Sequence, residues 1–349
     1  MNSQRKKGIG VRHVLLCLLF CLLFLAAAPL GAQGTRYAGA SLELGVGARP
    51  LALGGAAAAM SGGAELFRYN PASLGLCVNR EVGLMYAPTF GSISEPMATM
   101  HYLGGAFPLP AGGSVALHWT RFSVDEIPLY PKLAGDSFLD RLEDPSLRPD
   151  GAPQGYFKDV EDAFYLSFAR PFRFELPLGW LYTDLAVEVP VGLNIKILRQ
   201  ALHQSSASGL GIDLGMMVRF NLGQLLQLRR AGQMSLGLSA LDLTRTTLVW
   251  QNQREEKIGT ALLWGVVYSQ PISFHNSRLN FFWSLREKEE RNALYGVEYE
   301  LGGAALRAGY NESGLTAGAG LRWRRMRVDY AFTSLDYESV HRIGCAFIF

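Results

Sequence analysis

The C-terminal stretch Leu315–Phe349, LTAGAGLRWRRMRVDYAFTSLDYESVHRIGCAFIF, decides the fold of this 349-residue chain. At its start, apolar residues occupy every second position: Leu315, Ala317, Ala319, Leu321 and Trp323. The end of the chain repeats the pattern, with an apolar set opposite a polar or small one: Ile343, Cys345, Phe347 and Phe349 against Arg342, Gly344 and Ala346. A two-residue period describes a strand with two different faces. One apolar, aromatic face and one polar face are typical of a β-barrel that spans a membrane.

The same alternation extends back to Glu81 and predicts an all-β fold, a transmembrane antiparallel β-barrel of about 14 strands. The strands are expected at 81–90, 97–107, 114–124, 160–171, 183–199, 209–220, 234–241, 258–268, 279–285, 293–301, 304–311, 315–323, 326–333 and 340–349. An even number places both ends of the barrel on the periplasmic side of a bacterial outer membrane.

The connections between these strands support the same orientation. Three short connections are expected to be periplasmic turns: 108–113, 302–303 and 324–325. Three longer or more polar ones are expected to face outward: 125–159, 243–257 and 286–292. Two periplasmic links, 173–182 and 221–233, are longer than usual, and we interpret both as short amphipathic segments at the membrane interface.

The composition agrees with a barrel, because the chain has 39 Gly, 19 Phe, 14 Tyr and 6 Trp. Glycine permits bends, and aromatic residues mark the interfaces of outer-membrane barrels. The terminal Phe349 resembles the signal that the barrel assembly machinery reads, so this machinery and outer-membrane lipid are expected partners. No apolar run after residue 32 is long enough for a membrane helix.

The first 32 residues predict a cleaved secretory signal peptide. Four basic residues precede an apolar run at 14–30, and Gly31-Ala32 predicts cleavage before Gln33. The alternative is a membrane anchor, but the run is short and ends in small residues and a proline. Without the leader's four positive charges, the formal net charge falls from +3 to −1, so nucleic acid is not an expected partner.

Two cysteines, Cys77 and Cys345, remain after the signal peptide. They could pair in an oxidising compartment, although Cys345 is expected to face outward from the last strand. Two cysteines provide no zinc-site spacing, and we expect no metal or other cofactor.

The stretch before the first strand has a different character. Residues Leu42–Leu76 read LELGVGARPLALGGAAAAMSGGAELFRYNPASLGL and show no clean period of two or of 3.6 residues. Small residues let one backbone approach another closely, but they offer too few large side chains for an independent core. We therefore interpret residues 33–80 as a hatch inside a barrel formed by residues 81–349.

This stretch also carries a resemblance to a known family. Residues 45–56, GVGARPLALGGA, and the later Asn70-Pro71-Ala72 resemble the N-terminal motif of the PorV/PorQ family within the FadL-like outer-membrane proteins. Further matches lie at 192–196, 207–215, 330–332 and 341–343. The resemblance covers nearly all of the mature chain, but its motif does not separate the members of the superfamily.

The resemblance implies a 14-stranded barrel with an N-terminal hatch in the lumen. It also implies one of two activities: carrying fatty acid-like and other hydrophobic molecules past the hatch, or a type IX secretion shuttle that binds client C-terminal domains. The chain is shorter than the larger FadL members, which argues against a deep external ligand groove.

The candidate site residues fall into two groups. The hatch and gating candidates are Arg49, Pro50, Phe67, Tyr69, Asn70 and Pro71. The lumen charge candidates are Lys196, Asp213, Arg219, Glu298, Arg307, Arg322, Asp329 and Arg342. A charge in the lumen needs a partner, so we expect Arg49 to pair with Asp213, Glu298, Glu300 or Asp329. This network either anchors the hatch or binds a carboxylate ligand, and the aromatic residues either pack on the wall or line a hydrophobic pocket.

Signals for an enzyme are absent from the sequence. There is no G-x-S-x-G or H-E-x-x-H motif, and Pro50 breaks a dinucleotide fingerprint at residues 45–50. The sequence therefore favours a non-enzymatic outer-membrane barrel. An outer-membrane enzyme, with catalytic groups supplied by separate strands, is the remaining alternative.

Overall fold

The computed structural model describes residues 38–135, 137–148, 151–179, 183–228, 230–334 and 339–349. The expected signal peptide lies outside these residues. Among the described helices, none has the length and apolar character needed to span a membrane.

The described residues form sixteen strands in one antiparallel sheet, and all but β8 and β9 close into a barrel. The ring closes where β1 pairs with β16 and where β5 pairs with β6. The 14 barrel strands are β1 (Glu81–Gly91), β2 (Pro96–Pro108), β3 (Ser114–Leu129), β4 (Gly155–Leu178), β5 (Thr183–Leu202), β6 (Ser205–Asn221), β7 (Gln233–Leu241), β10 (Ala261–Ile272), β11 (Ser277–Glu287), β12 (Arg291–Leu301), β13 (Ala304–Asn311), β14 (Gly314–Trp323), β15 (Met326–Ser334) and β16 (Ser339–Ile348). The predicted fold class is confirmed.

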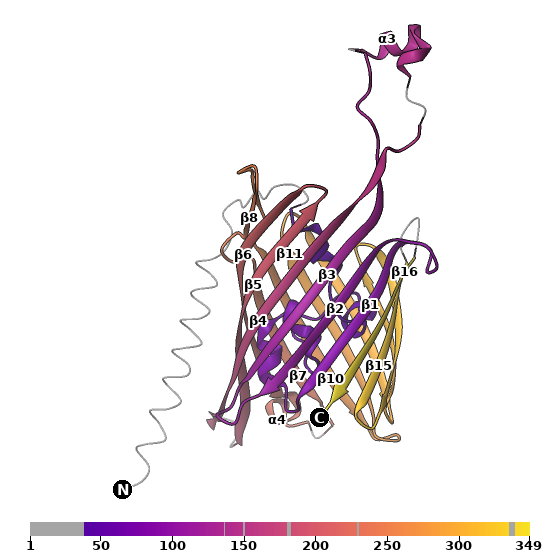
Figure 1. Cartoon of the computed structure of the whole chain (residues 1–349). Coiled ribbons are helices and arrows are strands. Elements are labelled where there is room, and N and C mark those ends of the chain that lie inside the picture. The colour runs from indigo at the N-terminus through magenta and orange to yellow at the C-terminus, as the bar shows by residue number, and fades with distance from the viewer. Residues whose placement is uncertain (1–37, 136, 149–150, 180–182, 229, 335–338) are drawn as a thin grey trace.

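The two ends of the barrel differ. We call the end where β1 begins and β16 ends the turn end, and the opposite end the loop end (Figure 1). At the loop end β3 and β4 continue far beyond the other strands, past a bulge between Val124 and Ile127. They lead to α3 (Phe138–Glu143) and η4 (Pro145–Leu147), and Ser137 starts α3 with a capping box. We call this projection, residues 125–159, the arm.

Two connections differ from the sequence-based expectations, and a third contains the expected short segment. The polar connection 243–257 contains a hairpin, β8 (Thr247–Trp250) and β9 (Glu255–Lys257), which adds to β6. The proposed interfacial segment at 173–182 is wrong, because β4 and β5 stay paired as far as Leu178 and Thr183. The alternating Phe174, Leu176 and Leu178 simply continue the strand. The link at 221–233 does contain a short helix, α4 (Leu222–Leu226).

The outer surface of the barrel is apolar, as the alternation predicts. On β14, Leu315, Leu321 and Trp323 are 69%, 60% and 64% exposed, while Thr316 on the inner face is buried. Such an apolar outer band suits the hydrocarbon of a bilayer. Cys345 is half-buried in the outward-facing set, and Cys77 and Cys345 are free thiols.

Residues 38–80 form an N-terminal segment that lies within the ring of strands (Figure 1). Its short elements are η1 (Ala40–Leu44), α2 (Ala48–Ala52), η2 (Ala64–Arg68) and η3 (Pro71–Leu76). Proline lies near the start of two of them, where a missing N–H costs little. From Ala56 to Met60 every side chain is at most 1% exposed.

Glycines on the inner faces of the strands make room for this segment. A Cβ at Gly237 of β7 would lie 2.0 Å from the Ala58 carbonyl oxygen. A Cβ at Gly192 of β5 would lie 2.3 Å from the Pro71 carbonyl carbon. Both distances are shorter than any real contact, so the backbone of the segment is held directly against the backbone of the wall.

Candidate functional site

Arg49 of α2 ties the N-terminal segment to the wall. Its guanidinium donates two hydrogen bonds to the Glu298 carboxylate of β12, at 2.9 and 2.8 Å. Glu300 lies 3.5 Å away, and the carbonyls of Ser61 and Gly62 also accept from Arg49. The two-pronged geometry is that of a strong arginine–carboxylate pair. Of the four expected partners of Arg49, the structure pairs it with the two glutamates.

The Arg49 pair belongs to a longer chain of charges. Glu298 also accepts from Arg307 of β13 at 2.6 Å, and Arg307 reaches Asp329 of β15 at 2.8 Å. Asp329 in turn accepts from Arg327 at 2.9 Å. Arg327 then returns to the segment through Glu65 at 2.8 Å and meets Glu81 at 3.2 Å. This series of ion pairs therefore holds the segment to the wall at two separate residues, Arg49 and Glu65.

A second buried network lies on the opposite wall. The Lys196 ammonium is fully buried between Asp213, at 2.7 Å, and Asp242, at 2.8 Å. Asn194 donates to Asp213 and to the backbone carbonyl of Phe67 in the segment. A buried charge is tolerated only with such partners, and this set also holds η2 in place.

The turn that joins η2 to η3 is fixed by its own side chains. Asn70 donates to the Ala58 carbonyl at 2.7 Å, and its side-chain oxygen accepts from the Ala72 N–H at the start of η3. The Tyr69 hydroxyl donates to the Val46 carbonyl at 3.1 Å, while Ser239 of β7 donates to the Tyr69 carbonyl. Asn70 and Pro71 therefore begin a short 3-10 helix that is anchored on several sides.

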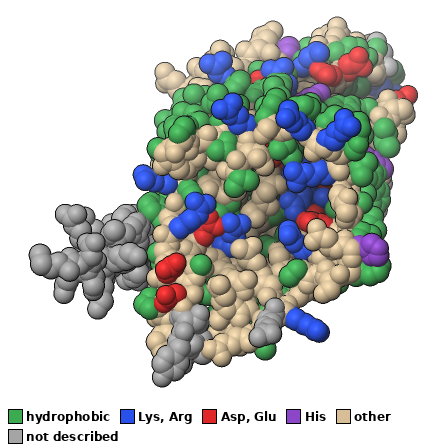
Figure 2. All heavy atoms as spheres, turned by 90° about the horizontal axis from the view of Figure 1, so that it is seen from below, with side chains coloured by type: hydrophobic (Ala, Val, Ile, Leu, Met, Phe, Trp, Pro, Cys, Tyr) green, Lys and Arg blue, Asp and Glu red, His purple; other side chains and the backbone are tan. Residues whose placement is uncertain are grey.

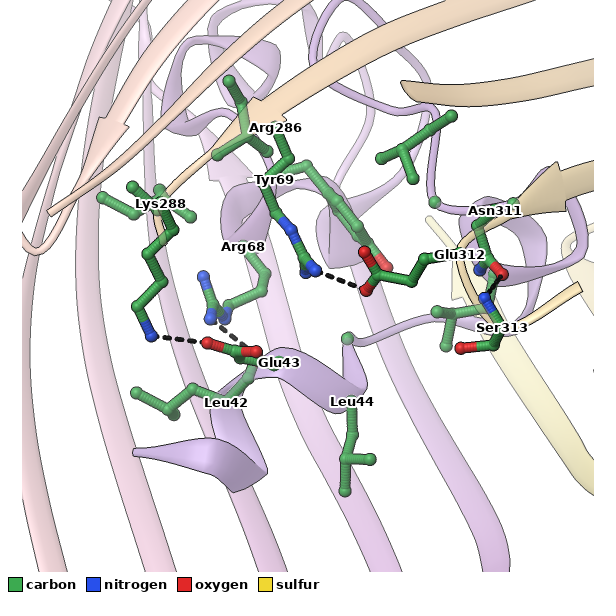
Figure 3. Close-up of a pocket in the computed structure, with 18 of the residues that line it drawn as sticks. Leu42, Glu43, Leu44, Arg68, Tyr69, Arg286, Lys288, Asn311, Glu312 and Ser313 are labelled. Carbon is green, nitrogen blue, oxygen red and sulfur yellow. Dashed lines mark hydrogen bonds and ion pairs between the residues drawn. The ribbon is translucent and has the colours of Figure 1, made fainter. Parts of the chain in front are cut away.

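At the loop end, a cavity of about 180 Å³ is lined by residues of both the N-terminal segment and the barrel wall (Figure 3). Much of its wall is apolar, from Leu42, Leu44, Leu51, Leu241, Ile258, Ala261, Leu263, Leu294 and Val340. Arg68, Arg286, Lys288 and Arg342 also line it, together with Glu43, Asp242 and Glu312. We call this space the outer cavity.

The basic groups of the outer cavity are not all neutralised. Lys288 pairs with Glu43, and Arg286 pairs with Glu312 (Figure 3). Arg342 is only 6% exposed, and its one hydrogen bond among the described residues goes to the Thr333 hydroxyl at 2.8 Å. A guanidinium buried without a carboxylate is costly, so an anion that entered the cavity would gain by meeting it.

The η1 helix lies at the outer cavity as a strap. One end is held where Ser41 donates to Glu161 of β4, and the other where Glu43 accepts from Lys288, which follows β11. Burial alone would raise the pKa of Glu43, but Lys288 outweighs it and holds this pKa below the ordinary glutamate value. The ion pair of the ionised Glu43 with Lys288 therefore stabilises the bound strap at neutral pH. This stabilisation is lost as the pH falls through the lowered pKa of Glu43, because the carboxylate is then protonated.

We therefore predict an acid-dependent loosening of the strap. A fluorophore on Ala40→Cys should become more mobile as the pH is lowered below the ordinary pKa range of a glutamate. The step should be small, below about 1 kcal/mol, because 43% of the Glu43 side chain is exposed to solvent. In the Glu43→Gln variant the strap should be mobile at all pH values. If its mobility still rises at low pH in this variant, the titrating group is another residue.

An inner cavity of about 390 Å³ lies below the segment at the turn end. Arg49, Ser61, Arg219 and Arg278 line it, and Arg219 is paired with Glu188. Lys and Arg side chains gather on this end of the barrel (Figure 2). Among the described residues none lines both cavities, and the segment contributes residues to each of them.

The lumen charge candidates do not form one cluster. Glu298, Arg307 and Asp329 belong to the chain at Arg49, whereas Lys196 and Asp213 form the opposite network. Arg322 is exposed at the end of β14, so it is no part of a buried network. Phe349 is 59% exposed, and its ring packs against Phe347 at 4.9 Å.

Sequence analysis missed several contributors. Glu65 and Arg327 complete the chain of charges, Asp242 completes the Lys196 site, and Arg68 lines the outer cavity. His118 was not among the site candidates, because it has no partner nearby in the sequence, yet its ring stacks on Phe67 with centroids 3.7 Å apart. The inward position of Arg327 and His118 follows from strand alternation, but no sequence signal identifies their partners.

No protein-family model matches the sequence, and no curated protein sequence matches it. Among solved structures, the toluene transporter TodX of Pseudomonas putida is similar at 9% identity, with 86% of this chain and 96% of that chain covered and a TM-score of 0.46. The outer membrane protein Omp33 of Acinetobacter baumannii gives 8% identity, 78% and 98% coverage and 0.40. A KdgM porin in complex with oligogalacturonate gives 7% identity, 77% and 99% coverage and 0.33. Structures this distant do not indicate what the present chain binds.

Proposed function

We propose that this protein is a non-enzymatic bacterial outer-membrane barrel of the PorV/FadL-like type that carries a hydrophobic small molecule past its N-terminal segment. The observation that supports this proposal best is the outer cavity, an apolar space that ends on the buried segment. In this proposal the segment acts as the hatch between the outer and inner cavities. The turn end faces the periplasm.

The chemistry of the outer cavity favours an acidic amphiphile, such as a fatty acid. Its apolar side chains suit a hydrocarbon tail. Arg342 offers a buried guanidinium that no described carboxylate neutralises. Arg68 adds a second one, which donates to the Leu42 carbonyl at 2.6 Å. A carboxylate head group would accept charge-assisted hydrogen bonds from either arginine.

The test compares a fatty acid with the alcohol of the same chain length. Arg342→Met should weaken binding of the acid by roughly ten- to a hundredfold, because a hydrogen bond to a charged group contributes about 1.5–3 kcal/mol. Binding of the alcohol should change little, since the apolar wall is intact. Calorimetry on the purified barrel measures both. An equal loss for acid and alcohol would show that Arg342 only shapes the cavity.

A second candidate function, the secretion shuttle, is favoured by the arm. The arm projects away from the barrel (Figure 1). Seven large apolar side chains are exposed among its described residues: Leu129 (37%), Tyr130 (55%), Leu133 (59%), Phe138 (70%), Leu139 (62%), Leu142 (56%) and Tyr156 (66%). Exposed apolar side chains in water mark surfaces that bind partners.

One deletion distinguishes the two candidate functions, transport and secretion shuttle. Replacing residues 130–154 by a short turn removes the tip of the arm and leaves the barrel closed, because β3 and β4 still pair as far as Leu129 and Gly155. If the protein is a transporter, uptake of the hydrophobic molecule should continue and protein secretion should be unaffected. If it is a secretion shuttle, secreted clients should fail to reach the cell surface.

A further inference from the structure

A row of polar side chains runs along the inner face of β3 and β4, behind the N-terminal segment. Three successive inward-facing pairs along this wall contain polar residues. His118 lies opposite Tyr165, Ala116 opposite Ser167, and Ser114 opposite Ala169. The row therefore follows the wall from the middle of the barrel to its turn end.

Each of these side chains has a buried polar atom without a hydrogen-bond partner among the described residues, although Nδ1 of His118 bonds to the Tyr102 hydroxyl. Ser114, His118, Tyr165 and Ser167 are 2%, 4%, 2% and 0% exposed. The two serine hydroxyls, Nε2 of His118 and the Tyr165 hydroxyl all lack a partner. The same holds on neighbouring elements for the Ser73 hydroxyl of η3 and the Asn194 side-chain oxygen of β5.

The N-terminal segment covers this row. The Phe67 ring stacks on His118 and meets Tyr165 edge-on at 4.8 Å. The η3 helix, which carries Ser73, packs on β3, β4 and β5. Unpartnered groups from both the wall and the segment therefore occur at one seam.

Six unpartnered buried groups are too many to leave unsatisfied. Each unsatisfied group costs about 1–3 kcal/mol, and native proteins contain only a few. Hydroxyls both donate and accept, the carbonyl oxygen accepts, and His118 can do either. No carboxylate, lysine or arginine is among the six, so neither a metal ion nor a charged ligand suits the set. Water suits it, because one molecule supplies both donors and acceptors.

A small cavity lies next to this seam, toward the loop end. It has a volume of about 20 Å³ and is lined by Ser41, Met100, Thr120, Glu161, Ala163 and Gln200. That volume is large enough for about one water molecule. Thr120 and Ala163 form the next inward-facing pair after His118 and Tyr165 in the direction of the loop end. The polar row therefore reaches, at Thr120, a space large enough for a water molecule.

We propose that the seam between β3–β4 and the N-terminal segment is a binding site for a file of ordered water molecules, held by Ser73, Ser114, His118, Tyr165, Ser167 and Asn194. The waters bridge the wall to η2 and η3. On this side of the segment the waters add to the direct Asn194–Phe67 hydrogen bond, whereas the β12–β15 side is joined by direct ion pairs. The proposal concerns the closed barrel and does not depend on what the protein carries.

Hydroxyl-radical labelling by X-ray pulses in H₂¹⁸O tests the proposal on the full-length barrel. Radicals form from bound water, so buried side chains beside it are labelled despite their burial. Phe67 and Tyr165 should be labelled severalfold faster than their burial predicts, with ¹⁸O incorporated. Met217 is the internal control, because it is 1% exposed and packs among Ala72 and Leu76.

The double variant Ser114→Ala/Ser167→Ala removes two water-binding hydroxyls and keeps the ring stack. Labelling of Tyr165 should fall severalfold, and that of Met217 should not change. If Phe67 and Tyr165 are labelled in the native protein as slowly as a dry core, the proposal is wrong. If the double variant fails to fold, Tyr165→Phe provides the same comparison at Phe67, and a crystal structure shows directly whether water lies at the seam.

Discussion

Joining the N-terminal segment to β16 by a disulfide will abolish uptake of the hydrophobic molecule. A Cβ at Gly344 would lie 3.4 Å from the Ala48 Cβ, close to the spacing of about 3.5–4.5 Å between the Cβ atoms of a disulfide. In Ala48→Cys/Gly344→Cys the segment cannot leave the wall. If the segment is the hatch, the outer and inner cavities then stay separated. Uptake is measured with a labelled fatty acid in cells or in proteoliposomes.

The controls for this disulfide use the same background. Cys77 and Cys345 are replaced by serine in every variant, because Cys345 directly follows Gly344. Each single cysteine should leave uptake unchanged, and a reducing agent should restore uptake in the double variant. Binding of the ligand at the outer cavity should persist in the oxidised protein. Full uptake by a barrel whose disulfide is verified by mass spectrometry would mean that the segment does not move.

Arg49→Ala is the second change with a large expected effect. The guanidinium is mostly buried, with 13% of its side chain exposed, and it links the segment to Glu298 and to the Ser61 and Gly62 carbonyls. Breaking a buried ion pair typically costs about 3–5 kcal/mol. The low end applies here, because Glu298 keeps its bond to Arg307. The loosened segment should raise ion conductance in planar bilayers and become accessible to protease.

Arg322→Ala is the matched control for this experiment. Arg322 is exposed at the turn end and forms no ion pair with any residue that the structure describes. Its removal should leave conductance as in the native protein. Unchanged conductance in Arg49→Ala would show that Arg49 neither anchors nor gates the segment. Glu298→Gln should act like Arg49→Ala, since it leaves both Arg49 and Arg307 without their shared carboxylate.

Strand positions could be predicted because their signal is local. The alternation at Leu315–Trp323 and at Ile343–Phe349 depends only on neighbouring residues, since each face of a strand meets one environment. The structure places β14 at Gly314–Trp323 and β16 at Ser339–Ile348, within one residue of the expected ranges. The ends of β3 and β4 at the arm, and the end of β4 at Leu178, were missed. Strand pairing there continues beyond the residues whose alternation suits a membrane.

The candidate site was predicted only in part. The sequence identified Arg49 as a charge that needs a partner, and Glu298 was one of the four candidates. It could not choose among them, because Arg49 and Glu298 are 249 residues apart in the chain and meet only when the barrel closes. The expected roles of Arg49, Asn70 and Pro71 in gating remain predictions.

The sequence by itself determined the membrane barrel, its number of strands and the unusual character of residues 42–76. These properties follow from periodicity and composition, which each strand or segment carries independently. Only the tertiary structure decided which charges pair, where the outer cavity lies and which polar groups share the β3–β4 seam. Those features bring together side chains from distant strands, and their positions depend on the register and closure of the whole sheet.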